Sequence, residues 1–345
     1  MPGTQTILTD WLISIHIHHL LELYIFYRNK VSKGCVSLAE KKYYYVTGNT
    51  AEGFVNFLDS NVVDIKKIVV LKHMSNKVKT RVLEELIRIY EQSYDLEIIC
   101  SALSRVFLDG IIIRDKGLAI ITETIAPSNL QHVKMIDLEN IIQNDIPIQT
   151  LDKHKITQLK AQYDQELEKA YKTFERGLRV HDDLEAIYIN EMDFKKADDV
   201  AERFISDLLQ GVSKKERKPR IYYRLFGAST AEGPITVVPQ LINNLSKRVF
   251  VKGRAGTGKS VFMKKVAQAC ENQRLDFEIH RCSFDPNSVD MVLVPDLSFV
   301  MLDSTDPHEF FPQRDGEYII DLYEEAVNPD TDEKYKEQIN RVNAH

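Results

Sequence analysis

From residue 43 onward, short apolar runs alternate with longer stretches in which apolar residues recur at helical spacing. Tyrosine-rich runs at 43–47 and 221–226 predict strands. The stretches 79–92 and 259–272 each follow an apolar run and predict helices. Strands that alternate with helices are typical of an α/β fold, with a parallel or mostly parallel sheet covered by helices.

A helical arm is predicted between these regions, over residues 154–211. Its apolar residues recur at steps of three and four, Glu and Lys occupy the other faces, and Gly211 suits a C-cap. This pattern indicates a solvated helical hairpin or small bundle. The run 181–183 (His-Asp-Asp) has residue types of a metal site, but we interpret it as helix surface. The basic run 213–220 predicts a charged linker, with a nucleic-acid patch as the alternative.

Residues 11–27 form a strongly apolar stretch that contains histidines at positions 16, 18 and 19. Its length is at the lower limit for a membrane span, and it lacks the pattern of a signal peptide. We interpret it as an interfacial or packed helix or a poorly ordered leader, with membrane association as the alternative. The histidines have no acidic or cysteine partner at ligand spacing, so they do not predict a metal site.

The chain repeats itself with an offset of 180 residues, as in Thr50 and Thr230 (230 − 50 = 180) or Lys79 and Lys259 (259 − 79 = 180). Four blocks keep their order and nearly constant spacing, which predicts two copies of one supersecondary unit. We expect residues 43–127 and 221–308 to superpose. In each copy a Thr-Ala-Glu-Gly run follows the tyrosine-rich strand, and Thr50 and Thr230 are predicted as helix N-caps.

The second copy contains the complete pattern Gly-x-x-x-x-Gly-Lys-Ser, between an apolar run and an amphipathic helix. This is a Walker A or P-loop pattern in the context that it requires. Glycines let backbone N–H groups approach phosphate oxygens, and the helix start adds its positive dipole end. The lysine is predicted to reach the phosphates, and the hydroxyl of Ser260 to bind Mg²⁺. Nine residues are predicted to contact the nucleotide: Gly253, Arg254, Ala255, Gly256, Thr257, Gly258, Lys259, Ser260 and Val261.

In the first copy the three loop glycines are replaced by His73, Asn76 and Val78. A β-branched residue such as Val78 does not easily adopt a P-loop backbone, and its side chain would occupy the phosphate space. Lys79 and Thr80 remain, but a lysine without the surrounding N–H groups is only a point charge. We therefore expect a structural pseudo-domain, with residual anion or nucleotide binding as the alternative.

The run 299–302 of the second copy is an apolar strand that ends in Asp303, which is a Walker B pattern. Its carboxylate is predicted to help hold Mg²⁺ and, with Lys259, to serve catalysis. The next residue is Ser304, so the glutamate that follows this aspartate in ABC-type ATPases is absent. Four other residues are candidates to orient water or a substrate hydroxyl, although each also suits a solvated loop: Asp285, Asp290, Asp306 and His308.

The composition and charge of the chain give no indication of nucleic-acid binding, a disulfide framework or a zinc site. The apolar content of 43% suffices for a core, and the formal net charge of −6 gives no electrostatic argument for nucleic acid. The four cysteines lie far apart without CxxC spacing, so they indicate reduced thiols rather than disulfides or a zinc site.

The tandem Thr-Ala-Glu-Gly and P-loop blocks, the run 303–308 and the arm sequence 170–188 resemble an uncharacterised family of bacterial ATP-binding proteins with duplicated P-loop units. The resemblance covers about residues 43–345. It implies cytoplasmic ATP binding and hydrolysis, and it identifies no substrate. The first loop departs from the family pattern, which argues against two nucleotide sites.

Together these features predict an internally duplicated α/β protein with the three-layer α/β/α arrangement of P-loop nucleoside triphosphatases and an inserted helical arm. The predicted parts are an N-terminal extension (1–42), a degenerate P-loop-like unit (43–150), the helical arm (151–212) and an intact nucleotide-binding unit (213–345). The predicted function is ATP binding with Mg²⁺-dependent hydrolysis. The alternatives are a kinase for a small molecule or nucleotide, and a non-catalytic ATP-dependent switch or scaffold for a partner that the sequence does not identify.

Overall fold

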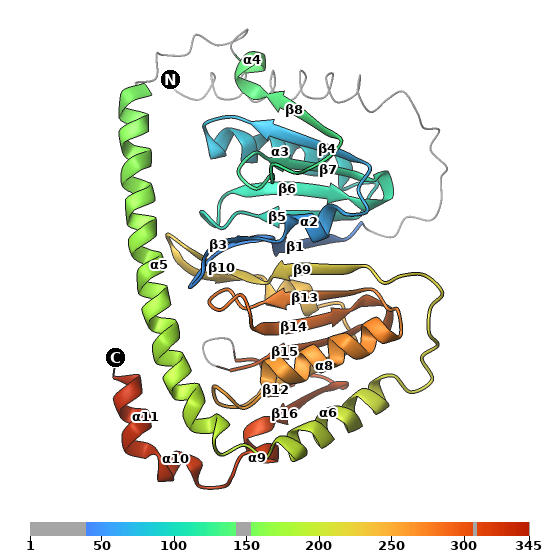
Figure 1. Ribbon diagram of the computed structural model, residues 1–345. Coiled ribbons are helices and arrows are strands. Elements are labelled where there is room, and N and C mark those ends of the chain that lie inside the picture. The colour runs from blue at the N-terminus through green and yellow to red at the C-terminus, as the bar shows by residue number, and fades with distance from the viewer. Residues whose placement is uncertain (1–38, 143–152, 306–308, 345) are drawn as a thin grey trace. The chain divides into compact units, whose positions relative to one another are not determined.

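The computed structural model describes residues 39–142, 153–305 and 309–344 (Figure 1). Contacts group the chain into unit 1 (residues 1–44 and 62–160) and unit 2 (residues 45–61 and 161–345). Residues 45–61, which the sequence assigns to the first copy, thus group with unit 2, and the predicted arm is shared between the units.

The apolar stretch 11–27, its histidines and Cys35 lie outside the described residues. Within the described part of the chain, no helix combines the length and apolar character that a membrane crossing requires.

Unit 2 contains a mixed sheet with the strand order β16-β12-β15-β14-β13-β9. Strand β12 is parallel to both of its neighbours, β13 is parallel to β9, and β14 is antiparallel to the strands on either side of it. The prediction of an α/β fold with a mostly parallel sheet is confirmed. The strands are β9 (Ile221–Leu225), β12 (Lys247–Lys252), β13 (Phe277–Arg281), β14 (Val289–Val294), β15 (Phe299–Asp303) and β16 (Glu317–Asp321).

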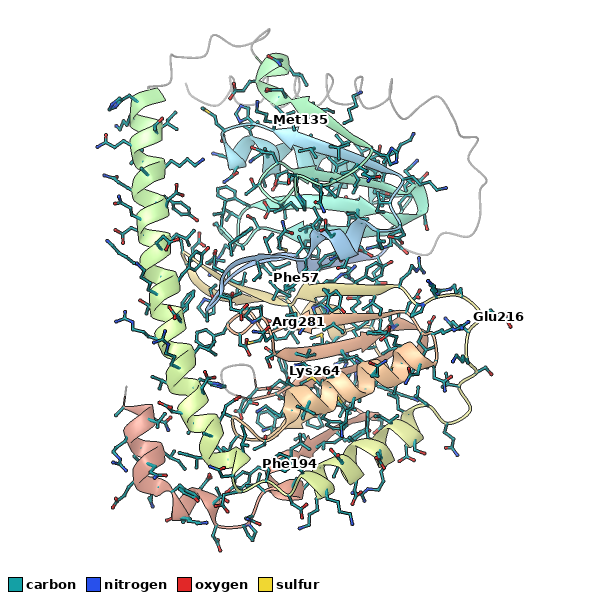
Figure 2. All side chains as sticks on the ribbon, in the orientation of Figure 1. Phe57, Met135, Phe194, Glu216, Lys264 and Arg281 are labelled. Carbon is teal, nitrogen blue, oxygen red and sulfur yellow. The ribbon has the colours of Figure 1, made fainter. Side chains whose placement is uncertain are left out.

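Helices lie against both faces of this sheet, because alternate side chains of each strand point to opposite faces. Val249 and Val251 face α6 (Phe194–Leu208) and α8 (Lys259–Asn272), whereas Phe250 between them faces α7 (Val238–Ile242). Side chains fill the space between α8 and the strands (Figure 2). Each fully buried side chain of this size contributes roughly 1.5–3 kcal/mol, so burial between α8 and the sheet stabilises unit 2.

The two Thr-Ala-Glu-Gly runs form tight β-hairpins, so the prediction of helix N-caps at Thr50 and Thr230 is wrong. Thr230 Oγ1 donates to Gly233 O at 2.8 Å and accepts from Glu232 N at 3.2 Å, and Thr50 does the same in its own turn. Gly233 has a φ of 104°, which lets the chain reverse within two residues. The hairpin strands are β2 (Thr47–Thr50), β3 (Gly53–Asn56), β10 (Gly227–Thr230) and β11 (Gly233–Thr236).

The first hairpin, although it comes from the first copy, is held within unit 2 by hydrogen bonds. Ala51 N donates to Phe284 O at 2.9 Å, and Asn49 Nδ2 donates to Ser229 O at 3.2 Å. These bonds explain why residues 45–61 group with unit 2.

Unit 1 has the strand order β1-β5-β6-β7-β4-β8, which follows the same sequence of pairings as unit 2. Strand β4 is parallel to β7 and β8, and β6 is antiparallel to β5 and β7. The strands are β1 (Lys41–Tyr45), β4 (Lys67–Lys72), β5 (Leu96–Cys100), β6 (Leu108–Ile113), β7 (Leu118–Thr122) and β8 (Val133–Asp137), and the helices are α3 (Asn76–Tyr90) and α4 (Leu138–Ile142). Helix α2 (Leu58–Val62) groups with unit 2 except for its last residue.

The predicted arm is helical, as α5 (Lys153–Ile189) and α6. It is not a solvated hairpin, because α6 packs on α8 and α9 through Val200, Ala201 and Phe204. The remaining elements are the 3-10 helices η1 (Arg114–Lys116) and η2 (Pro295–Leu297) and the helices α9 (Leu322–Ala326), α10 (Thr331–Lys334) and α11 (Lys336–Asn343).

A buried charged network joins β9 to β13 in unit 2. The side chain of Arg224 is fully buried, and its guanidinium lies 2.9 Å from Glu278 Oε2 and donates through Nε to Asn61 Oδ1 at 2.8 Å. His280 Nε2 lies 3.2 Å from the same carboxylate. A buried cation without its counter-ion carries the full cost of desolvation, so the pair constrains this part of the core.

We predict that Glu278→Ala lowers the free energy of unfolding by about 3–5 kcal/mol, because Arg224 would remain buried without its counter-ion. Urea denaturation followed by circular dichroism measures the change. The exposed Glu202→Ala on α6 is the control and should change stability by less than about 0.5 kcal/mol. Equal effects of the two substitutions would contradict the prediction.

Candidate functional site

Six residues, 253–258, connect β12 to α8 in unit 2. Gly253, Gly256 and Gly258 have φ angles of 143°, 75° and 84°, a region that favours glycine. A side chain at Gly253 would also place its Cβ 2.4 Å from Thr257 Oγ1. The loop backbone therefore depends on the glycines that the sequence pattern singles out.

Lys259, the first residue of α8, folds back over this loop. Its Nζ donates to the backbone oxygens of Gly253 and Arg254, each at 2.9 Å, and lies 3.7 Å from Asp303 Oδ2. The ammonium is thus held inside the curve of the loop, beside one carboxylate.

The parallel pairing of β12 with β15 brings Asp303 to this loop. Asp303 ends β15 opposite Val251, the residue before the last of β12. Its Oδ1 accepts a hydrogen bond from Thr305 Oγ1, while Ser260 Oγ accepts from Val289 N at 2.9 Å. A hydroxyl and a carboxylate are hard oxygen ligands of the kind that Mg²⁺ prefers, so these residues fit the ion.

A second carboxylate, Asp290, lies in the same region because it follows Val289 in β14. Burial, and after it the charge of Asp303, raises the pKa of Asp290 from 3.8 to about 7, against the opposing effects of a hydrogen bond with Cys282 and of the charge of Lys259. Burial likewise raises the pKa of the Cys282 thiol. Of the two candidates that the structure describes, Asp285 and Asp290, it is Asp290 whose carboxyl interacts with Asp303.

The other three candidates are placed differently. Asp285 Oδ1 accepts from Asn287 N at 3.0 Å and stabilises a turn. Asp306 and His308 lie outside the described residues. Ser304 occupies the position after Asp303 at which ABC-type ATPases have a glutamate, and its Oγ donates to Phe310 O at 2.7 Å.

Residues distant in sequence form the outer wall of the 253–258 loop. Arg254 donates to Asp332 Oδ2 at 2.8 Å, and Asp332 Oδ1 accepts from Tyr188 OH at 2.8 Å. A side chain at Gly256 would place its Cβ 2.5 Å from Glu185 O of α5. Sequence reasoning missed this wall, because no local pattern links Tyr188 or Asp332 to a loop so distant along the chain.

The run on α5 with metal-site residue types brings together His181, Asp182 and Glu185, whose ligand atoms lie within 4.8 Å of one another. His181 and Asp182 are exposed, and i,i+4 neighbours on a helix meet in this way without a ligand. Asp183 is not part of the group.

The corresponding region of unit 1 is closed. Helix α3 begins at Asn76, so only residues 73–75 connect it to β4. Lys79 is 3% exposed, and its Nζ donates to Glu123 Oε1 at 3.0 Å and Thr124 Oγ1 at 3.2 Å. The ammonium therefore already has a carboxylate partner.

Comparisons with protein-family models, with curated proteins and with solved structures find no match for this chain.

Unit 1 also contains a buried carboxylate, Asp109. Burial raises its pKa from 3.8 to about 6, against the opposing effects of hydrogen bonds from Ser101 and Thr122 and of the charge of Lys79. Because the folded chain holds this proton more tightly than the unfolded chain, the contribution of Asp109 to stability is lost as the pH rises from about 4 to above 6.

We predict that this loss amounts to about 3 kcal/mol, from the difference between 3.8 and about 6. Asp109→Asn, which stays neutral, should therefore be more stable than the wild type at pH 7.5 and close to it at pH 4. Urea denaturation of both proteins at the two pH values tests this. A stability difference that does not change with pH would show that Asp109 does not titrate in this range.

Proposed function

We propose that unit 2 binds ATP with Mg²⁺ at the 253–258 loop and the start of α8, and that it is a Mg²⁺-dependent ATPase of the P-loop class. The observation that carries the proposal is the loop itself. Three glycines with positive φ precede Lys259, whose side chain is largely buried, and Ser260 at the start of a 14-residue helix. The carboxylate of Asp303 ends the adjacent parallel strand. A glycine-rich turn that leads into a helix favours phosphate recognition by backbone N–H groups, and the lysine, the hydroxyl and the carboxylate supply the charge and metal ligands that a nucleotide with Mg²⁺ needs.

Each residue of the site has a distinct part in the proposal. The loop N–H groups and the N-terminal end of α8 would contact the phosphates. Lys259 would exchange two carbonyl acceptors for phosphate oxygens, which carry more negative charge. Ser260 and Asp303 would hold Mg²⁺, which when bound neutralises negative charge on the transferred phosphoryl group.

Asp290 is the residue that we propose to orient the attacking water. It follows Val289, whose N–H bonds Ser260, and its carboxyl interacts with Asp303 and Lys259. In the kinase alternative the attacking group is a substrate hydroxyl, and ADP would then be produced only when that acceptor is present. Measuring ADP production with and without candidate acceptors therefore distinguishes a kinase from an ATPase.

A switch is the second candidate function, and two contacts favour it. The backbone of α5 lies against Gly256, and Arg254 of the same loop is bound to Asp332 near the C-terminal end of the described chain. A change in the loop on nucleotide binding would act directly on these contacts. Slow or absent turnover with a nucleotide-dependent change in hydrodynamic radius would support a switch over an ATPase.

We predict that Lys259→Ala weakens Mg-ATP binding by about 2–4 kcal/mol, which is roughly 30- to 1,000-fold in Kd. Lys79→Ala is the matched control and should change the affinity little, because the ammonium of Lys79 is already paired with Glu123. Isothermal titration calorimetry gives affinity and stoichiometry, and thermal melting checks that both variants are folded. Two equivalent sites per chain would contradict the assignment of binding to unit 2 alone.

We predict that Asp303→Asn lowers Mg²⁺-dependent ATP affinity or turnover while ADP binding without Mg²⁺ stays nearly unchanged. The substitution keeps the size and hydrogen bonding of the side chain but removes the charge that only the metal-bound state uses. ATP and ADP affinities are measured with and without Mg²⁺ for both proteins. If asparagine serves equally well in all four measurements, Asp303 only stabilises the turn after β15.

A further inference from the structure

Strand β16 forms one edge of the sheet in unit 2, with β12 as its partner. Arg248 N of β12 donates to Gly316 O at 3.1 Å. In a parallel ladder the bonded residues alternate, so Tyr318 and Ile320 direct their backbone groups to β12. Ile319 therefore directs its N–H and C=O away from the sheet, and no described residue outside the ladder donates to or accepts from them.

Strand β16 is short and has a carboxylate at each end, but its middle residues include no lysine or proline of the kind that often protects an exposed edge. The sequence of β16 is Glu-Tyr-Ile-Ile-Asp, with Tyr318 47% exposed and Ile319 38% exposed. In β8 of unit 1, the ladder position that corresponds to Tyr318 holds Lys134. Tyr318 thus lacks the charge that at this position of β8 opposes pairing with a further strand.

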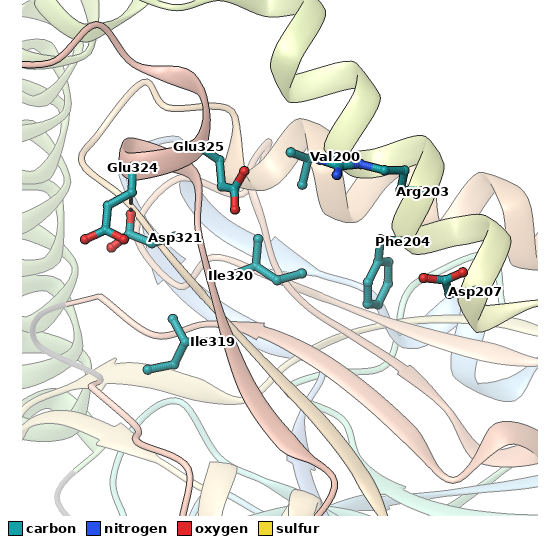
Figure 3. A pocket seen from close by; sticks show the side chains of 9 residues that line it. All are labelled: Val200, Arg203, Phe204, Asp207, Ile319, Ile320, Asp321, Glu324 and Glu325. Carbon is teal, nitrogen blue, oxygen red and sulfur yellow. Dashed lines mark hydrogen bonds between the residues drawn. The ribbon is translucent and has the colours of Figure 1, made fainter.

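A groove of about 490 Å³ runs beside this edge, between β16, α6 and α9 (Figure 3). Its apolar floor is formed by Val200 and Phe204 of α6 and by Ile320 of β16. Apolar side chains of an added strand would find a contact surface here.

The walls of the groove are acidic. Asp207 of α6 and Glu324 and Glu325 of α9 line it, and none of their carboxylates forms an ion pair with another described residue. Asp207 lies near Tyr318, whose pKa is raised by burial and by this neighbouring charge. Arg203 is the one cationic residue among those that line this groove.

We propose that this groove binds an extended basic segment of a partner protein, which adds a strand to β16. The segment would accept a hydrogen bond from Ile319 N–H and donate one to Ile319 C=O. Alternate apolar side chains would pack on Phe204 and Ile320, and lysine or arginine side chains would pair with the acidic walls. Main-chain bonds supply affinity in this mode, and the charges select basic partners.

Charge also distinguishes this occupant from a second copy of the chain. Pairing of two β16 strands would bring two sets of the same carboxylates, from Asp207, Glu324 and Glu325, toward one another. Like charges at an interface are unfavourable, whereas a basic segment neutralises them.

The test uses the full chain and a fluorescein-labelled eight-residue peptide of alternating Lys and Val, with binding followed by fluorescence anisotropy. Two control peptides are an acidic one of alternating Glu and Val and a Lys-Val peptide methylated on alternate backbone nitrogens. We expect saturable binding of the first peptide and at least tenfold weaker binding of both controls. The methylated peptide keeps the charge, so it separates strand addition from general electrostatic attraction.

Two variants complete the test. Ile319→Pro removes the outward N–H and should weaken binding at least tenfold, with thermal melting to confirm folding. Glu324→Gln with Glu325→Gln should weaken it by roughly tenfold, whereas the same charge change at Glu166 and Glu175 on α5 should have little effect. Absence of saturable binding, equal binding of the methylated peptide, or concentration-dependent dimerisation that Ile319→Pro abolishes would each overturn the proposal.

Discussion

A lysine ammonium enclosed at the start of a helix must find acceptors, and the acceptors that it finds separate the two units. In unit 2, Lys259 bonds two backbone oxygens of the preceding loop, and only one carboxylate lies near it. In unit 1, Lys79 bonds a glutamate and a threonine after β7. A neutral carbonyl is a weaker partner for a cation than an anion is, and for this reason we propose the lysine of unit 2, not that of unit 1, as the phosphate ligand.

The shape of the loop before each helix determines which acceptors the lysine can reach. With glycine at three positions of positive φ, the chain in unit 2 completes a six-residue loop before α8 begins. With asparagine and valine at two of the corresponding positions, α3 begins three residues earlier relative to its lysine. The backbone N–H groups that a phosphate would need are then part of the helix, and the side chain of Lys79 is directed to Glu123 instead.

The sheet of unit 2 serves two proposed roles through two different parts of its geometry. The carboxyl ends of the parallel strands β12 and β15 bring Lys259 and Asp303 together. The outer side of β16 presents the N–H and C=O of Ile319, which pair with no described residue, next to an acidic groove. Helix α9 follows β16 directly and contains both Tyr323, whose ring centroid lies 5.3 Å from the guanidinium carbon of Arg254, and Glu324, which lines the groove. The proposed nucleotide site and the proposed docking groove therefore share one short helix.

The sequence by itself determined the local features. Apolar runs and amphipathic periodicity predicted β12, α8 and the mostly parallel α/β sheet, because period and burial act over a few residues. The glycine spacing predicted a loop that the φ angles then show to require glycine. The same local reasoning misread Thr50 and Thr230, since a threonine followed three residues later by glycine suits a hairpin turn as well as a helix start. Only the tertiary structure decided what depends on contacts between distant segments. These are the grouping of residues 45–61 with unit 2, the packing of α6 on α8, the wall of Tyr188 and Asp332 around Arg254, and the pairing of Lys79 with Glu123. Such contacts arise from how chain segments remote in sequence pack and pair their charges, and no short pattern in the sequence encodes them.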